Sequence, residues 1–250
     1  KKFMNAKKNV VICGGSYGLG LEITKYFLKK KFNVIVLARN KLKLIEIKKI
    51  IKNKNLEVYE CDLSILQEVE NVFSKIKEKK KIVHYLICNA GSGKPEYIIN
   101  KKYIDYKKAY EQNLFTATNP IEVLINKKNF KNLKILTIAS IAGYFKGNAP
   151  LPYSLAKNSL INYSKEISKE LAKKKITINS ISPGHILQKN NNWYKKYILN
   201  KKKINNFIHK NVGLKKFCTP NDIINAIEFL ISKESEYITG IDLKVDGNTN

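Results

Sequence analysis

The strongest constraint on the fold is a regular alternation between short apolar runs and longer amphipathic stretches. The segments between the runs have helical apolar spacing and lie near 18–31, 41–53, 64–80, 103–128, 153–174 and 219–232. Strands that alternate with helices predict βαβ units and a parallel sheet covered on both faces, which is an α/β fold. The predicted strands are Asn9–Cys13, Asn33–Ala38, Leu56–Cys61, Ile82–Cys88, Leu133–Ser140, Ile176–Ser182 and Ile241–Val245.

The chain of 250 residues contains no internal repeat and no linker rich in Pro, Gly or Ser, so we expect a single domain over 1–250. No apolar run approaches the roughly 20 residues of a membrane span, and the polar start does not resemble a signal peptide. We therefore expect a cytoplasmic protein without a membrane partner. An Asn/Lys-rich segment with the only tryptophan, Trp193, interrupts the pattern, and we predict a substrate lid at about 186–212.

The net charge of +27 would ordinarily indicate a nucleic-acid partner. Here Arg39 is the only arginine, and the lysines are spread along all the predicted helices and loops rather than gathered in a stripe. This distribution favours solvated lysine faces, and we expect no nucleic-acid partner. The four cysteines form no CxxC pair and the three histidines lie far apart, so we also expect no metal site and a reduced environment.

A glycine-rich turn, Gly14-Gly15-Ser16-Tyr17-Gly18-Leu19-Gly20, follows the first predicted strand and opens a helix. Such a turn lets the backbone approach a pyrophosphate, which the helix N-terminus then binds through its N–H groups. The same residues match the G-x-S-x-G elbow of α/β-hydrolases. That elbow would come too early in this chain, and His209 in the predicted lid is a poor third member of a triad, so we favour a dinucleotide site.

The residue at the end of the second predicted strand bears on the choice of coenzyme. A carboxylate there would bind a ribose 2′-hydroxyl, but this chain has Ala38 and Arg39. A guanidinium suits a 2′-phosphate, so we expect NADP(H), with NAD(H) as the second choice. The alternative is an ordinary surface arginine.

A tyrosine and a lysine four residues apart, Tyr153 and Lys157, would share one face of a helix. The spacing alone is not specific, because four other tyrosines in this chain also have a lysine four residues later. Only Tyr153 follows a buried run that ends in Ser140 and a Gly/Pro loop. This context selects the pair Tyr153 and Lys157.

Taken in order, the motifs from Asn9 to Gly247 resemble the short-chain dehydrogenase/reductase family. They are Gly14-x-x-x-Gly18-x-Gly20, Asp62, Asn89-Ala90-Gly91, Asn113, Ser140, Tyr153-x-x-x-Lys157, Pro183-Gly184, Thr239-Gly240 and Asp246-Gly247. The resemblance implies a Rossmann-type doubly wound sheet of seven parallel strands, assembled as a homodimer or homotetramer.

The resemblance also implies a role for each matched residue. Tyr153 would be the general acid/base, and Lys157 would lower its pKa and hold the nicotinamide ribose. Ser140 would hydrogen-bond the substrate oxygen, and Asn113 would anchor a water-mediated proton relay. The expected cofactor-binding residues are Gly14, Ser16, Tyr17, Gly18, Leu19, Gly20, Arg39, Asp62, Leu63, Asn89, Ala90, Gly91, Tyr153, Lys157, Pro183, Gly184 and Ile186.

Four positions depart from the family pattern without removing a catalytic group. Cys13 replaces a threonine that braces the glycine turn, and Tyr17 stands where NADP-preferring members often have a second basic residue. Gln188 replaces a threonine after the Pro-Gly pair, and Asn248 replaces the final glycine. These changes concern coenzyme preference and lid contacts rather than the chemistry.

The sequence thus predicts an NADP(H)-dependent oxidoreductase that transfers hydride between nicotinamide and a carbonyl or alcohol substrate. Two substrate classes stay open, a 3-oxoacyl thioester and a sugar-derived ketone. The alternative function is a catalytically idle NADP(H)-binding scaffold or sensor with the same fold.

Overall fold

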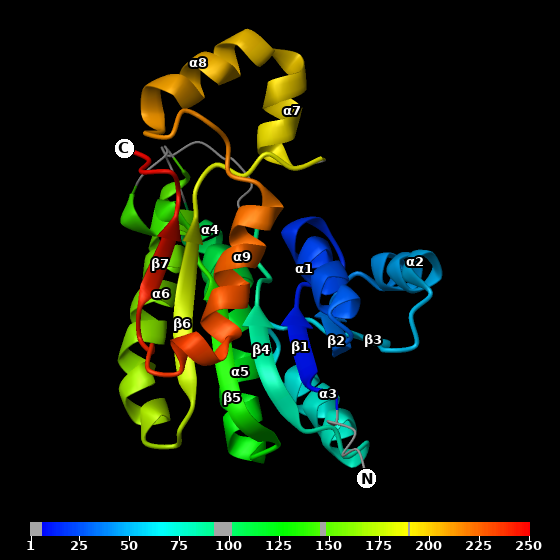
Figure 1. Ribbon diagram of the computed structural model, residues 1–250. Helices are drawn as coiled ribbons and strands as arrows, with labels where there is room; N and C mark the ends of the chain where they lie inside the picture. The colour runs from blue at the N-terminus through cyan, green and yellow to red at the C-terminus, as the bar shows by residue number, and fades with distance from the viewer. Residues whose placement is uncertain (1–6, 93–101, 146–148, 190) are drawn as a thin grey trace.

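Seven parallel strands form one sheet in the order β3-β2-β1-β4-β5-β6-β7 (Figure 1). The computed structural model describes residues 7–92, 102–145, 149–189 and 191–250. Each predicted strand is present, with ends shifted by a few residues at most. The strands are β1 (Asn9–Cys13), β2 (Asn33–Ala38), β3 (Leu56–Glu60), β4 (Val83–Cys88), β5 (Phe130–Ile138), β6 (Thr177–Pro183) and β7 (Asp242–Val245).

Helices cover both faces of the sheet, because alternate strand residues point to opposite sides. On one face Val10 and Ile12 pack with α1 (Gly18–Lys29), α2 (Lys41–Ile51) and α9 (Pro220–Ile231). On the other face Val11 and Cys13 pack with residues of the remaining long helices. These are α3 (Leu66–Glu78), α5 (Thr116–Lys127) and α6 (Leu151–Ala172). The expected single Rossmann-type domain is confirmed.

The helix predicted over 103–128 is not continuous, so this prediction was wrong in detail. It consists of α4 (Tyr103–Tyr110), a π-helical turn at Glu111–Phe115 and α5. A π turn accommodates one extra residue and occurs often at functional sites. Here it contains the buried Asn113, whose side-chain amide donates to the Ala109 carbonyl at 3.0 Å.

The segment predicted as a lid of weak periodicity forms two helices, α7 (Asn192–Leu199) and α8 (Lys201–Asn211). Both begin at asparagine caps, because Asn191 accepts from the Tyr194 N–H at 2.8 Å and Asn200 accepts from the Lys203 N–H at 2.9 Å. In Figure 1 the two helices lie beyond the carboxyl ends of the strands, at the top of the view.

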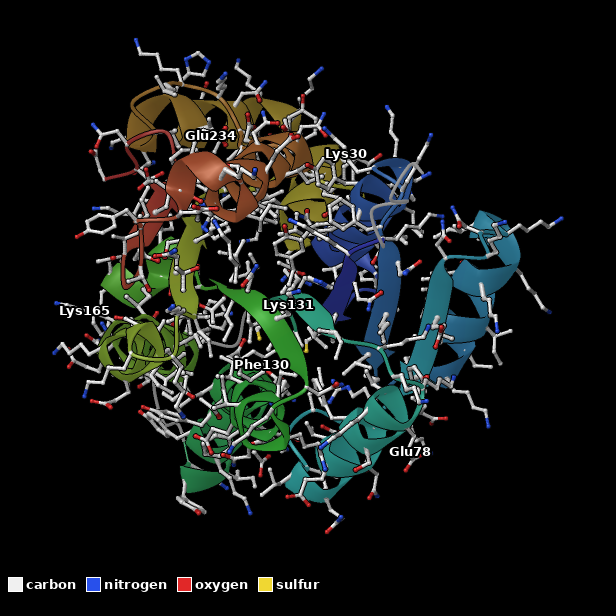
Figure 2. All side chains as sticks on the ribbon, turned by 60° about the horizontal axis from the view of Figure 1, so that its bottom comes forward. Lys30, Glu78, Phe130, Lys131, Lys165 and Glu234 are labelled. Atoms are coloured by element: carbon white, nitrogen blue, oxygen red, sulfur yellow. The ribbon has the colours of Figure 1, made fainter. Side chains whose placement is uncertain are left out.

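The lysines lie on all sides of the molecule. Figure 2 shows side chains with nitrogen ends around the whole outline, and its labelled lysines come from three separate elements. These are Lys30 after α1, Lys131 in β5 and Lys165 in α6.

Within the described residues, no helix combines the length and apolar character needed to cross a membrane.

Candidate active site

Two adjoining cavities lie at the carboxyl ends of the strands. The strand order reverses between β1 and β4, and open α/β sheets bind ligands at such a switch point. The first, the Tyr153 cavity, has a volume of about 350 Å³, and the second, the Arg39 cavity, has a volume of about 440 Å³. The two share Asn89, Gly91 and Ser92 in their walls, so one elongated ligand can occupy both.

The glycine turn after β1 is a backbone cradle that side chains would fill. Gly14 has φ +77°, and a Cβ there would lie 2.8 Å from the Ala90 Cα. A Cβ on Gly20 would lie 1.9 Å from the Gly14 carbonyl oxygen. Asn89 donates its side-chain N–H to that same oxygen at 3.1 Å. Only glycine fits at both positions, and the turn stays open for a phosphate group to approach.

The brace that Cys13 cannot supply comes from another residue. The Thr24 hydroxyl, fully buried in α1, donates to the Gly15 carbonyl at 2.9 Å. The turn therefore keeps a hydroxyl-based support despite the departure at Cys13.

The Arg39 cavity carries the groups expected of an adenosine site. Arg39 follows β2, and Asp62 follows β3. The Asp62 carboxylate accepts from the Ser64 N–H at 3.0 Å and from its hydroxyl at 2.7 Å, which fixes the loop. Lys43, from the first turn of α2, lines the same cavity and places its ammonium 5.9 Å from the centre of the Tyr17 ring. Lys43 was not predicted, because one lysine among so many in this sequence carries no signal.

Most of the expected cofactor-binding residues line one of the two cavities. Gly18 instead lines a third cavity with Gln188, and Gly20 lines none of the three. The Arg39 cavity contains Gly14, Ser16, Tyr17, Arg39, Asp62, Leu63, Asn89, Ala90 and Gly91, and the Tyr153 cavity contains Leu19, Asn89, Gly91, Tyr153, Lys157, Pro183, Gly184 and Ile186.

Ser140 and Tyr153 meet in the Tyr153 cavity. Ser140 follows β5 by two residues and caps a 3-10 turn (Ile141–Tyr144) by accepting from the Ala142 N–H at 3.1 Å. Burial raises the pKa of Tyr153 above its ordinary value, and a hydrogen bond with the Ser140 side chain lowers it by a smaller amount. The phenol therefore holds its proton firmly in the ligand-free protein.

Lys157 is a buried cation one helical turn after Tyr153. Its side chain is 4% exposed, and its ammonium donates to the Ile138 carbonyl at 2.8 Å. Burial lowers the pKa of Lys157 to about 8. The ammonium lies 5.9 Å from the centre of the Tyr153 ring, close enough for its charge to favour the phenolate.

Asn113 joins this group through the loop after β4. Its side chain accepts from the Ser92 N–H at 3.0 Å and donates to the Ser92 carbonyl at 3.1 Å. A Cβ on Gly91 would lie 2.9 Å from the Asn113 side-chain oxygen and 3.2 Å from the Lys157 ammonium. The glycine of Asn89-Ala90-Gly91 therefore lets the loop pass between these two residues.

Several wall residues of the Tyr153 cavity were not predicted. They come from the β6–α7 loop and from α7, and they are His185, Asn191, Asn192 and Lys196. Trp193 also lines this cavity, and its ring lies 4.5 Å from His185 and 5.3 Å from Phe207. Trp193 thus packs α7 against His185 and α8 and also lines the cavity.

Comparisons with known proteins agree with this geometry. A protein-family model described as "Enoyl-(Acyl carrier protein) reductase" matches residues 14–249. The 3-oxoacyl-(acyl-carrier-protein) reductase FabG of Buchnera aphidicola subsp. Schizaphis graminum is 30% identical over 249 residues, which cover 96% of each chain.

Two solved structures share the fold over nearly the whole chain. L-Sorbose reductase from Gluconobacter frateurii, complexed with NADPH and L-sorbose, has a TM-score of 0.86 at 24% identity and covers 98% of this chain and 97% of its own. 4-Hydroxyisoleucine dehydrogenase, complexed with NADH, has a TM-score of 0.82 at 28% identity and covers 97% of this chain and 98% of its own.

The fold and the paired cavities define a nucleotide-dependent oxidoreductase. The chain belongs to the short-chain dehydrogenase/reductase family and is an NAD(P)-dependent enzyme of that family.

The buried ammonium of Lys157 should make stability depend on pH. With a folded pKa of about 8 against an ordinary 10.5, the unfolded chain binds more protons between these values, so stability rises with pH across that window. At pH 7 and without ligand, we expect the free energy of unfolding of Lys157→Met to exceed that of the wild type by up to about 3 kcal/mol. The lost hydrogen bond to Ile138 reduces this difference, and the difference should shrink as the pH rises towards 10. Urea unfolding at a series of pH values measures this difference.

Lys165→Met is the control, because Lys165 is exposed on the same helix. A difference between Lys157→Met and wild type that does not change with pH would contradict the burial of a charge.

Proposed function

We propose that this protein is an NADPH-dependent reductase of a 3-oxoacyl thioester, reversible as an alcohol dehydrogenase. The observation that carries the proposal is the meeting of Tyr153, Lys157 and Ser140 in one cavity that adjoins a second, basic cavity. A scaffold or sensor would have no need for this set of groups. The retention of all four expected catalytic positions, Asn113 included, therefore favours an enzyme.

The residues present fit a phosphorylated dinucleotide. The cradle at Gly14 and Gly20 admits a pyrophosphate, and the start of α1 offers N–H groups to it. Arg39 and Lys43 supply two cations where a 2′-phosphate would lie, so NADP(H) is the preferred coenzyme and NAD(H) the second. Asp62 and Leu63 would face the adenine, and Lys157 would hold the nicotinamide ribose.

The chain's own side chains would manage the proton while the bound coenzyme supplies the hydride. Tyr153 donates its phenolic proton to the carbonyl oxygen, and Ser140 hydrogen-bonds the same oxygen as negative charge develops there. The ammonium of Lys157 stabilises the phenolate that remains. Asn113, held by its bonds to Ser92, would anchor the waters that return a proton from solvent.

The relatives, rather than the fold, support the proposed substrate class. The FabG relatives, at 30% identity over almost the whole chain, carry the name of a 3-oxoacyl-(acyl-carrier-protein) reductase. The L-sorbose reductase structure is less than 25% identical and supports the fold alone. A sugar-derived ketone is therefore the second candidate, and a substrate panel containing both classes separates them.

The segment at about 186–212 would serve as the substrate lid of this enzyme. It supplies Trp193 and Lys196 to the cavity wall, and α7 contains no fully buried residue. We also propose a homodimer or homotetramer working in the cytoplasm. Exposed Tyr103, Ile104 and Phe115, all within 103–115, are apolar surface that a second subunit could cover.

We expect Tyr153→Phe to lose at least a hundredfold in turnover of an acetoacetyl thioester, because the proton donor is gone. NADPH binding should stay within a few-fold of wild type, since the hydroxyl does not hold the nucleotide. NADPH oxidation and fluorescence titration measure the two quantities. Tyr163→Phe is the control, because that buried hydroxyl lies on the same helix and has no partner among the described residues. More than about a tenth of wild-type activity in Tyr153→Phe would disprove the assignment.

We expect the wild type to bind NADPH more tightly than NADH and Arg39→Asp to reverse this order. Each charge-assisted hydrogen bond to the 2′-phosphate is worth about 1.5–3 kcal/mol. Lys43→Ala should weaken NADPH binding about tenfold and leave NADH binding unchanged, whereas Lys41→Ala, outside the cavity, should change neither. Dissociation constants from fluorescence titration test this, and equal wild-type affinities for the two coenzymes would refute the role of Arg39.

A further inference from the structure

One polar side chain in the wall of the Tyr153 cavity has no part in the chemistry described above. His185 follows Pro183-Gly184 at the end of β6 and lines the same cavity as Ser140 and Tyr153. It is 6% exposed. Its position therefore places an imidazole beside the space that a substrate must occupy.

The imidazole has an unmet hydrogen-bonding capacity. The Nε2 atom is buried and finds no hydrogen-bond partner among the described residues. Buried polar atoms are nearly always paired, so an orphan in a native structure calls for an explanation. A ligand that bonds to Nε2 would provide one.

Packing does not explain the histidine. Its ring lies 4.5 Å from Trp193 and 5.5 Å from Phe207, in an aromatic cluster that joins the β6–α7 loop to both lid helices. Phenylalanine would fill this place without burying an unpaired nitrogen. The unpaired Nε2 atom therefore lowers the stability of the ligand-free protein.

Trp193 of α7 lies against the imidazole. Trp193 and Lys196 both come from α7, which has no buried residue of its own. The Lys196 ammonium lies 5.1 Å from the centre of the Trp193 ring. A shift of this lightly packed helix would expose Nε2 to a ligand and bring an ammonium to the same end of the cavity.

The imidazole is neutral at physiological pH. Burial lowers the pKa of His185 to about 4, the Asp246 carboxylate opposes this shift, and the Lys196 ammonium adds to it. A neutral imidazole donates one hydrogen bond and attracts no counterion, so it suits a neutral oxygen acceptor.

We propose that His185 is a specificity-determining residue that donates a hydrogen bond from Nε2 to a second oxygen of the substrate, beyond the carbonyl that is reduced. In a 3-oxoacyl thioester, this second oxygen is the thioester carbonyl. The identity of that oxygen rests on the proposed function, whereas the hydrogen bond to a second oxygen does not.

The test compares two ketones that differ in the second oxygen. S-acetoacetyl-N-acetylcysteamine carries it, and the thioether S-(3-oxobutyl)-N-acetylcysteamine, in which CH2 replaces the thioester carbonyl, does not; the measured quantity is the ratio of their kcat/KM values with NADPH. We expect His185→Phe to lower this ratio at least tenfold, mainly through a higher KM for the thioester. His185→Asn, which keeps an N–H donor, should retain more of the ratio than His185→Phe, and the exposed His209→Phe on α8 should retain all of it.

An unchanged ratio in His185→Phe would overturn the proposal, as would a loss confined to kcat and equal for both ketones. Thermal unfolding shows whether His185→Phe folds. If it does not fold, the same ratio measured on His185→Leu tests the proposal. A wild type that reduces a ketose but no thioester would refute the proposed substrate class. In that case the ratio of kcat/KM for the ketose to kcat/KM for 2-heptanone is measured instead. A drop of at least tenfold in His185→Phe would support the role of His185, and an unchanged ratio would overturn it.

Discussion

The burial of one charged group, the ammonium of Lys157, organises the catalytic end of the molecule. Taking a cation out of water is costly, and the low pKa of Lys157 shows this cost. The Ile138 carbonyl at the end of β5 offsets part of it. Gly91 must lack a side chain for the loop after β4 to pass the ammonium, and Asn113 holds that loop through Ser92. Elements distant in sequence therefore meet around the Lys157 ammonium, a buried charge that the stability of the fold does not require.

Two irregular backbone segments also lie in the walls of the two cavities or beside them. The π turn at Glu111–Phe115 places Asn113 inward. The positive φ of Gly14 and the crowding at Gly20 keep the first turn short enough for a phosphate. Glycine adopts this backbone without a steric penalty, and π turns are often found at functional sites.

Much of this could be predicted from the sequence. The inner strands β1, β2 and β4 are apolar runs buried on both faces and leave a plain signal, whereas the edge strands β3 and β7 are mostly half-buried. Ser140, Tyr153 and Lys157 follow from their order along the chain. Lys43 and His185 could not be recognised, because one lysine among many carries no signal and a lone histidine has no motif. Helices α7 and α8 were missed because both are short and rich in Asn and Lys. The caps at Asn191 and Asn200 were the available clue.

The central claim is that Tyr153 acts as an acid and base whose pKa Lys157 lowers once the site is complete. The pH dependence of kcat/KM for oxidation of a 3-hydroxyacyl thioester with NADP⁺, measured on the wild type, tests this most directly. The account predicts a rise with pH whose midpoint lies well below 10, the ordinary pKa of tyrosine. A flat profile, or a midpoint at or above 10, would contradict it.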